Sequence, residues 1–159
     1  MSNFTTNEED QKDAANLQAR LKKSAGDDDG DYKDIEVDSA TAYQRIPNVT
    51  IAEGKHKYVL MSAVLPGSSE RQNFVVSRAF ADYHCNVAEP MAEALERSGY
   101  KSISITGGGR IALDTDKRSI FVYGFSYGFG LADHALSVSV VQVDRRYKDY
   151  EVTWSNEGY

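Results

Sequence analysis

The stretch KYVLMSAV at residues 57–64 decides the fold class, because it is an almost unbroken apolar run. A run of this length without polar alternation is typical of a strand that is covered on both faces. The turn residues PGSS at 66–69 end it, and FVVSRAF at 74–80 predicts a second strand. We therefore expect a sheet whose central strands are buried between two layers.

Two helices are predicted to cover this sheet. Over Val87–Ser98 the apolar side chains form one stripe and the charged ones face away. Asn86 with Glu89 resembles a capping box, and Gly99 occupies the place of a C-terminal cap. A second helix is predicted over Ala132–Tyr147, where the apolar spacing is helical although the valines also favour a strand.

Further strands are predicted at 102–105, 111–113, 119–123 and 150–154. The glycines at 107–109 are expected to end the first of these, and residues 114–118 are typical of a hairpin turn. The order of elements predicts an α/β (α+β) protein with a single mixed β-sheet flanked by two principal helices.

Charge divides the chain into two parts. The net charge is −6, and it is carried by residues 1–40, which hold eleven acidic and five basic side chains. Apolar residues are sparse there, so we expect residues 1–41 to be an acidic, disordered and dispensable tail, and residues 42–159 to form the domain. The remaining charges balance, which argues against nucleic acid or an anionic membrane as a partner.

Neither a metal site nor a disulfide is expected. Residues 27–36 have a partial calcium-loop spacing, but Ala25 occupies the first ligand position, so a solvated acidic linker is the better interpretation. Cys85 is the single cysteine, which excludes an internal disulfide and a cysteine zinc site and fits a reducing compartment. The N-terminus lacks the features of a secretion signal, and no apolar run approaches the ~18 residues of a membrane span. We expect a cytoplasmic monomer.

His84 is the strongest candidate for chemistry. It lies in ADYHCN at 81–86, two residues before the predicted helix cap. A side chain there faces unpaired amides and the positive end of the helix dipole, which favours anions and a neutral, nucleophilic imidazole. The alternative is a histidine that packs at a helix end without a chemical task.

Two glycine-rich turns, Gly107–Arg110 and Ser126–Gly130, could present backbone amides to a phosphate, or could be simple tight turns. Cys85 adjoins His84, but the chain lacks the Cys-x5-Arg loop of cysteine phosphatases, so we exclude a thiol mechanism. Side chains that could clamp a phosphate, each also consistent with an ordinary surface charge, are Lys57, Arg78 and Arg110.

Six ordered segments resemble the phosphohistidine phosphatase family, which includes the insect janus proteins. They are KYVLM at 57–61, ADYH at 81–84, GGGR at 107–110, VYGFS at 122–126, ADHALS at 132–137 and YEVTWSNEGY at 150–159. The resemblance covers about residues 46–159, and several motifs in order are more specific than one short pattern.

The resemblance implies an enzyme that hydrolyses the P–N bond of phosphohistidine in proteins or peptides and needs no metal or other cofactor. Cys85 and Gly128 stand where the family often has alanine; both are small, so the phosphate site should survive. The residues that the resemblance implicates are the catalytic His84, the substrate-binding Lys57 and Arg78, the phosphoryl-holding turn Ser126, Tyr127 and Gly128, and His134 beside the site.

Two questions stay open at the level of sequence. His84 could attack phosphorus as a nucleophile, or it could act as a general base that activates water. A janus-type protein could also bind phosphate in a regulatory, sex-differentiation role without catalysis, because a fold does not guarantee an activity. The presence of Lys57 together with His84 favours the enzyme.

Overall fold

The computed structural model describes residues 2–27 and 45–157, and over these residues the chain forms three α-helices and one six-stranded mixed sheet. The strand order is β1-β3-β2-β4-β5-β6. The elements are α1 (Ser2–Asp27), β1 (Val49–Thr50), β2 (Gly54–Val64), β3 (Arg71–Ser77), α3 (His84–Arg97), β4 (Lys101–Asp114), β5 (Ser119–Tyr123), α4 (His134–Gln142), the 3₁₀ turn η2 (Arg145–Tyr147) and β6 (Glu151–Trp154). The predicted α+β class is confirmed.

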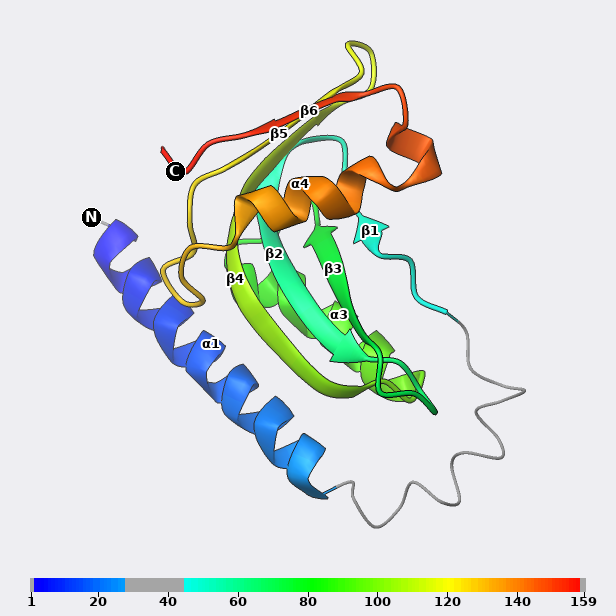
Figure 1. Cartoon of the computed structure of the whole chain (residues 1–159). Helices are drawn as coiled ribbons and strands as arrows, with labels where there is room; N and C mark the ends of the chain where they lie inside the picture. Colours follow the sequence, from blue (N-terminus) through cyan, green and yellow to red (C-terminus); the bar gives the residue numbers. More distant parts are fainter. Residues whose placement is uncertain (1, 28–44, 158–159) are drawn as a thin grey trace.

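Helices cover both faces of the sheet. In Figure 1, α4 crosses in front of the strands and α3 lies behind them. Along β2, Val59 packs into the core on the α3 side and Tyr58 into the core on the α4 side. This two-sided burial explains why residues 57–64 show no polar alternation. Helix α4 also confirms the helix predicted over Ala132–Tyr147, which is interrupted before η2.

The N-terminal segment corrects the expectation of a disordered tail, because Ser2–Asp27 forms the helix α1. Figure 1 shows α1 lying beside β4. Its Leu17 and Leu21 are buried in the same core as the apolar face of α3. The rest of the predicted tail and most of the possible calcium loop lie outside the described residues, and the domain boundary at residue 42 stays a prediction.

The docking of α1 has a physical cause in the sheet. Strand β5 pairs with β4 over Arg110–Asp114, which leaves the earlier half of β4 without β5 as a neighbour. The Gln18 amide covers this edge: its Nε2 donates to Ile105 O at 2.7 Å, and Ile105 N donates to its Oε1 at 3.3 Å. Arg20 pairs with Glu96 of α3 at 3.1 Å. A helix that covers a strand edge prevents that edge from pairing with another chain.

Replacing Leu21 by alanine should therefore lower the free energy of unfolding by about 2–3 kcal/mol, because a buried leucine loses its burial energy and leaves a gap. Leu21 is 2% exposed. Urea unfolding followed by circular dichroism measures the change. The adjacent exposed Lys22→Ala is the matched control and should stay within about 0.5 kcal/mol of wild type. Equal urea midpoints of unfolding for Leu21→Ala and Lys22→Ala would mean that α1 does not pack against the rest of the protein in solution.

Two element boundaries differ from the prediction. Strand β3 ends at Ser77, before the predicted end at Phe80, whose backbone is left-handed with φ 63°. Helix α3 begins at His84, three residues earlier than predicted. Asn86 caps it from within the first turn, since its Oδ1 accepts a hydrogen bond from Tyr83 N at 2.9 Å. His84 thus belongs to the first turn of the helix instead of preceding it.

The glycines at 107–109 do not end a strand, which is a further correction. β4 runs through them and pairs with Tyr58–Leu60 of β2. The register then shifts at a bulge that leaves Thr106 as the extra residue, and bulges are frequent beside functional sites. The hairpin predicted around residues 114–118 is confirmed, because Asp114 pairs with Ser119.

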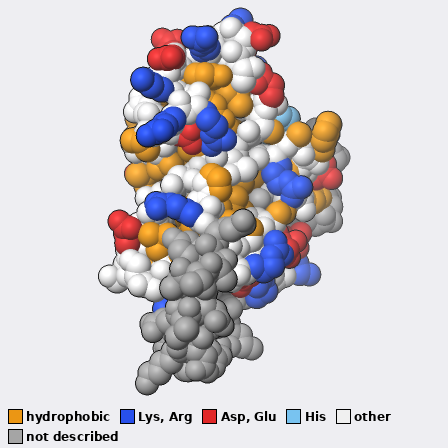
Figure 2. Space-filling view, turned by 90° about the vertical axis from the view of Figure 1, so that its right-hand side faces the viewer, with side chains coloured by type: hydrophobic (Ala, Val, Ile, Leu, Met, Phe, Trp, Pro, Cys, Tyr) orange, Lys and Arg blue, Asp and Glu red, His pale blue; other side chains and the backbone are white. Residues whose placement is uncertain are grey.

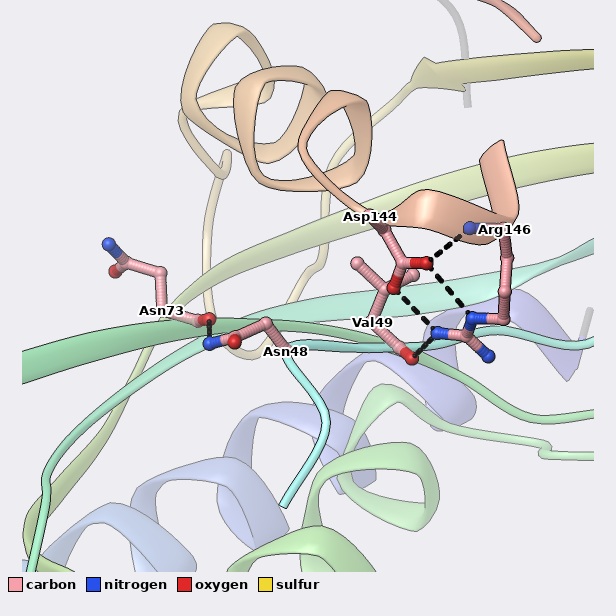
Figure 3. A network of polar contacts seen from close by, with 5 residues as sticks. All are labelled: Asn48, Val49, Asn73, Asp144 and Arg146. Carbon is pink, nitrogen blue, oxygen red and sulfur yellow. Dashed lines mark hydrogen bonds and ion pairs between the residues drawn. The ribbon is translucent and has the colours of Figure 1, made fainter. Parts of the chain in front are cut away.

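The short edge strand β1 is fixed by a hydrogen bond from Arg146 of η2. In Figure 3, Arg146 Nη2 donates to Val49 O at 2.5 Å and to Asp144 Oδ2 at 2.8 Å. The Arg146 hydrogen bonds lower the pKa of Asp144. On the other side of Val49, Asn48 Nδ2 donates to Asn73 O at 2.8 Å. These contacts fix the segment through which the chain enters the sheet.

Among the helices of residues 2–27 and 45–157, none is long and apolar enough to cross a membrane. Figure 2 shows the face on the right of Figure 1, where acidic and basic side chains are interspersed with apolar ones.

Candidate active site

His84 is the first residue of α3, and its side chain is buried, with an exposed fraction of 0%. Its Nε2 lies 2.8 Å from Gly109 O. A carbonyl oxygen can only accept a hydrogen bond, so Nε2 carries the proton, and in the neutral ring Nδ1 holds the lone pair. The strand β4 therefore orients the imidazole and determines which nitrogen is basic.

Gly108 and Gly109 of β4, called here the glycine pair, let the side chains of site residues pack directly against the strand backbone. A Cβ at Gly108 would lie 3.0 Å from both His84 Cδ2 and Ser126 Cβ. A Cβ at Gly109, whose side points to the opposite face of the sheet, would lie 2.8 Å from His134 Cε1. The absence of side chains at these two positions is what allows two histidines to approach β4 from opposite faces.

The predicted phosphate-binding turn is closed by its own backbone. Ser126 N donates to Gly130 O at 3.1 Å, and Gly130 N donates to Ser126 O at 2.8 Å. Gly108 N also donates to Gly130 O at 3.0 Å, which connects the turn to strand β4. The Ser126 amide is thus engaged within the turn, and the predicted donors that follow it are the amides of Tyr127 and Gly128.

Two cationic residues lie on the same face of the sheet as His84. Lys57 pairs with Arg110 across β2 and β4, and Arg110 pairs with Tyr123 of β5. Lys57 is two residues from Val59, which pairs with Gly108, so both side chains leave the sheet on the Gly108 side. Two residues span about 6.6 Å along a strand. Lys57 and Arg110 therefore start within reach of an anion bound at His84.

Arg78 is placed differently from the other predicted residues. It is exposed on the loop between β3 and α3. There it lines a cavity of about 330 Å³ together with Phe80, Asp82 and Asn86. The structure thus brings His84, Ser126, Lys57 and Arg110 around one part of β4. Arg78 lies apart from them, near the first turn of α3. The roles of all these residues stay predictions.

A second buried histidine supports the segment that leads to Ser126. His134 Nε2 donates to Gly124 O at 2.7 Å, and its Nδ1 accepts from the Tyr58 hydroxyl at 2.6 Å. Tyr58 in turn lies 3.0 Å from Ser137 Oγ. Burial lowers the pKa of His134 and raises that of Tyr58, so both groups are neutral and each donor finds an acceptor. The family resemblance implied a place beside the site for His134, but nothing in the sequence indicated this chain of contacts.

Replacing His134 by glutamine should reduce the loss of stability in mild acid. Burial holds the pKa of folded His134 below 6.5, whereas the unfolded chain takes up a proton near 6.5. The contribution of the neutral ring is complete above pH 6.5 and is lost as pH falls through the folded pKa, by at most about 1.4 kcal/mol per pH unit.

Urea unfolding at pH 7.5 and pH 5.5 tests this expectation. His134→Gln should be less stable than wild type at pH 7.5, because it loses buried hydrogen bonds, yet should lose less on acidification. His56→Gln, at a half-buried histidine whose Nε2 contacts Glu53 O, is the matched control, because it removes a histidine that has no part in the contacts of His134 with Tyr58 and Gly124. An acid dependence that is the same in His134→Gln and wild type would contradict the argument.

Cys85, which follows His84, is 7% exposed, and its Sγ lies 3.8 Å from Asp13 O of α1. Helix α1 thus reaches the first turn of α3.

Within residues 2–27 and 45–157 there is no group of three or more His, Cys, Asp and Glu side chains that could hold a metal ion.

Comparison with known families decides where the chain belongs. The Janus/Ocnus family matches residues 43–151. The chain belongs to the Janus/Ocnus family. The resemblance to this family is thereby confirmed, and the matched residues include the strands β1–β5, the helices α3 and α4 and the whole candidate site. Helix α1 precedes the part that matches the Janus/Ocnus family.

Curated Janus/Ocnus relatives carry two kinds of name. The 14 kDa phosphohistidine phosphatase of Sus scrofa is 35% identical over 127 residues, which are 76% of this chain and 98% of the relative. The Homo sapiens protein of the same name is 36% identical over 120 residues, 72% of this chain and 94% of the relative. The sex-regulated protein janus-A of Drosophila simulans is 36% identical over 124 residues, 76% of this chain and 87% of the relative.

Proposed function

We propose that this protein is a phosphohistidine phosphatase that hydrolyses the P–N bond of phosphohistidine in proteins or peptides, with His84 as the reacting residue. The observation that carries the proposal is the 2.8 Å hydrogen bond from His84 Nε2 to Gly109 O, because it leaves a lone pair on Nδ1. The relatives named 14 kDa phosphohistidine phosphatase, at 35% and 36% identity, support the same activity. The family resemblance further implies that no metal is required.

In the proposed reaction, His84 Nδ1 attacks phosphorus in line with the P–N bond of the substrate. That bond breaks, the departing imidazole nitrogen takes a proton from solvent, and the phosphoryl group is left on His84. Water then attacks the same phosphorus and gives up a proton to solvent, the bond to His84 breaks, the His84 nitrogen regains its lone pair, and inorganic phosphate leaves. Transfer between two imidazoles is nearly isoenergetic, so the covalent step divides the barrier at little thermodynamic cost.

The surrounding groups would stabilise the phosphoryl oxygens. We assign this role to Lys57, to the amides that follow Ser126, and to Arg110, which the sheet register pairs with Lys57. Arg78 is retained as a substrate-binding residue at the entrance to α3. If His84 acts instead as a general base, Nδ1 takes the proton of a water that attacks phosphorus directly, and the same groups hold the oxygens.

A second candidate function is a janus-type phosphate-binding protein without catalysis. Two observations favour it. His84 is 0% exposed, so a substrate reaches Nδ1 only after the residues that cover the ring have moved. The sex-regulated protein janus-A of Drosophila simulans is also as similar to this chain as the human phosphatase is, at 36% identity.

One experiment separates the two functions. Purified full-length protein is mixed with a phosphohistidine peptide in EDTA, and both peptide binding and release of inorganic phosphate are followed. The phosphatase proposal expects catalytic release that continues over many turnovers per protein molecule. Saturable binding without release of phosphate would overturn it in favour of the binding protein, and release that requires an added divalent metal would overturn the metal-independent mechanism.

A further inference from the structure

Two features of Phe80, the exposure of its ring and its backbone conformation, are energetically unfavourable and are not explained by its local contacts. Of the large apolar side chains in the described part of the chain, it is the most exposed, at 100%, and Val143 follows at 82%. Its φ of 63° also lies in the left-handed region, which is an outlier for a bulky residue that is not glycine. Strained residues of this kind concentrate at functional sites, so Phe80 warrants a functional explanation.

The loop that displays Phe80 is anchored at both ends. Ser77 Oγ accepts a hydrogen bond from Ala52 N at 2.9 Å, where β3 ends. At the other end, Tyr83 N donates to Asn86 Oδ1 at 2.9 Å, where α3 begins. Between them Ala81 packs against the core on the α3 side. The ring of Phe80 is therefore presented to solvent from a defined position.

This position lies on the segment that leads to His84. Phe80 and Arg78 line the cavity of about 330 Å³ that extends to Asn86 in the first turn of α3. Phe80 precedes His84 by four residues, so their Cα atoms are at most about 14 Å apart. An extended substrate chain covers the same distance in about four residues. A side chain close in sequence to a phosphohistidine bound at His84 can thus reach the Phe80 ring.

We propose that Phe80 is a specificity-determining residue that docks the protein chain on which the phosphohistidine is carried. The inference rests on the proposed function of His84. The ring contacts an apolar side chain within about four positions of the phosphohistidine, and it loses its exposure when that chain binds. Aromatic residues that are exposed in the unbound protein and covered on binding commonly dominate the energetics of recognition.

The test compares three substrates in the full-length protein: phosphoramidate, a phosphohistidine peptide with leucines within four positions of the phosphohistidine, and the same peptide with serines in their place. Wild type should prefer the leucine peptide over the serine peptide. Phe80→Ala should lower the ratio of kcat/KM for the leucine peptide to that for phosphoramidate by about tenfold. Phe80→Gly, which also relieves the left-handed strain, should lower this ratio equally, since the ring is the part that docks.

Val143→Ala is the matched control, because it removes a side chain of similar exposure beyond the end of α4 and should leave the ratio unchanged. A Phe80→Ala ratio within twofold of wild type, with all substrates turned over, overturns the docking role and leaves the proposed function intact. Failure of wild type to turn over any of the three overturns the proposed function. In that case calorimetry measures how tightly wild type and Phe80→Ala bind the two peptides. Loss of the preference for the leucine peptide in Phe80→Ala would support the docking role of Phe80. Retention of that preference would overturn the docking role.

Discussion

His84→Ala should lower kcat/KM for a phosphohistidine peptide by about 10³-fold, because no other group is expected to supply the lone pair that attacks phosphorus or accepts the proton of water. The side chain is 0% exposed, so its removal also leaves a gap in the structure. Phosphate release should therefore be measured at a temperature at which circular dichroism shows the variant to be folded. His84→Gln, which fills more of the same space, should be equally inactive.

His56→Ala is the matched control for this substitution, since it removes another histidine of the same sheet and should keep most of the activity. Turnover by folded His84→Ala at the wild-type rate would remove His84 from the mechanism. The nucleophile and the general base are then distinguished in wild type by rapid quench at low temperature. A nucleophile leaves acid-labile, base-stable phosphate on His84, whereas product formation without a labelled protein and without a burst favours direct attack by water.

Gly109→Ala should have the largest effect on stability, with a loss of about 3 kcal/mol or more in the free energy of unfolding. The new Cβ would overlap Tyr123 O and would lie 2.8 Å from His134 Cε1, and neither neighbour is the flexible end of a side chain. The Gly109 carbonyl also accepts the hydrogen bond from His84 Nε2, so a shift of this backbone should reduce activity in the molecules that remain folded.

Gly67→Ala is the matched control for the glycine substitution. Gly67 has a φ of 68°, and a Cβ there would meet no atom within 4 Å, so its substitution tests backbone strain without a steric clash. We expect a cost of about 1–2 kcal/mol and full activity. Thermal and urea unfolding measure both variants. If Gly109→Ala were no less stable than Gly67→Ala, close packing of His134 and the Tyr123 carbonyl against β4 would not be the reason for the glycine.

Where structure is encoded locally, the sequence was sufficient. The run at 57–64 predicted a strand buried on both faces, and the spacing over Val87–Ser98 predicted an amphipathic helix. The turn at 114–118 predicted the β4–β5 hairpin. In each case the signal comes from neighbouring residues: an unbroken apolar run, a helical spacing of apolar side chains, and a cluster of turn residues. The same local information placed His84 at a helix N-terminus.

Where structure depends on distant partners, local pattern misled. Few large apolar residues near the N-terminus suggested disorder, yet Gln18 is held by the edge of β4 at Ile105, a residue far away in the chain. The capping residue of α3 was placed one turn too late, because Asn86 caps from inside the helix through Tyr83 N. Phe80 was assigned to a strand, although its backbone leaves the sheet to present the ring.

For the candidate site, the sequence determined the residue types and their order, and the tertiary structure decided their geometry. Three glycines in a row suggest a turn when judged alone, because glycine tolerates every backbone conformation. Only the packing shows that Gly108 and Gly109 lie within a continuous strand, where His84 and His134 approach from opposite faces. The tautomer of His84 likewise follows from the Gly109 carbonyl, which lies 25 residues along the chain and is brought to the ring by the sheet. Such contacts leave no periodic trace in the sequence, since they depend on the distance between two elements and not on the character of either one.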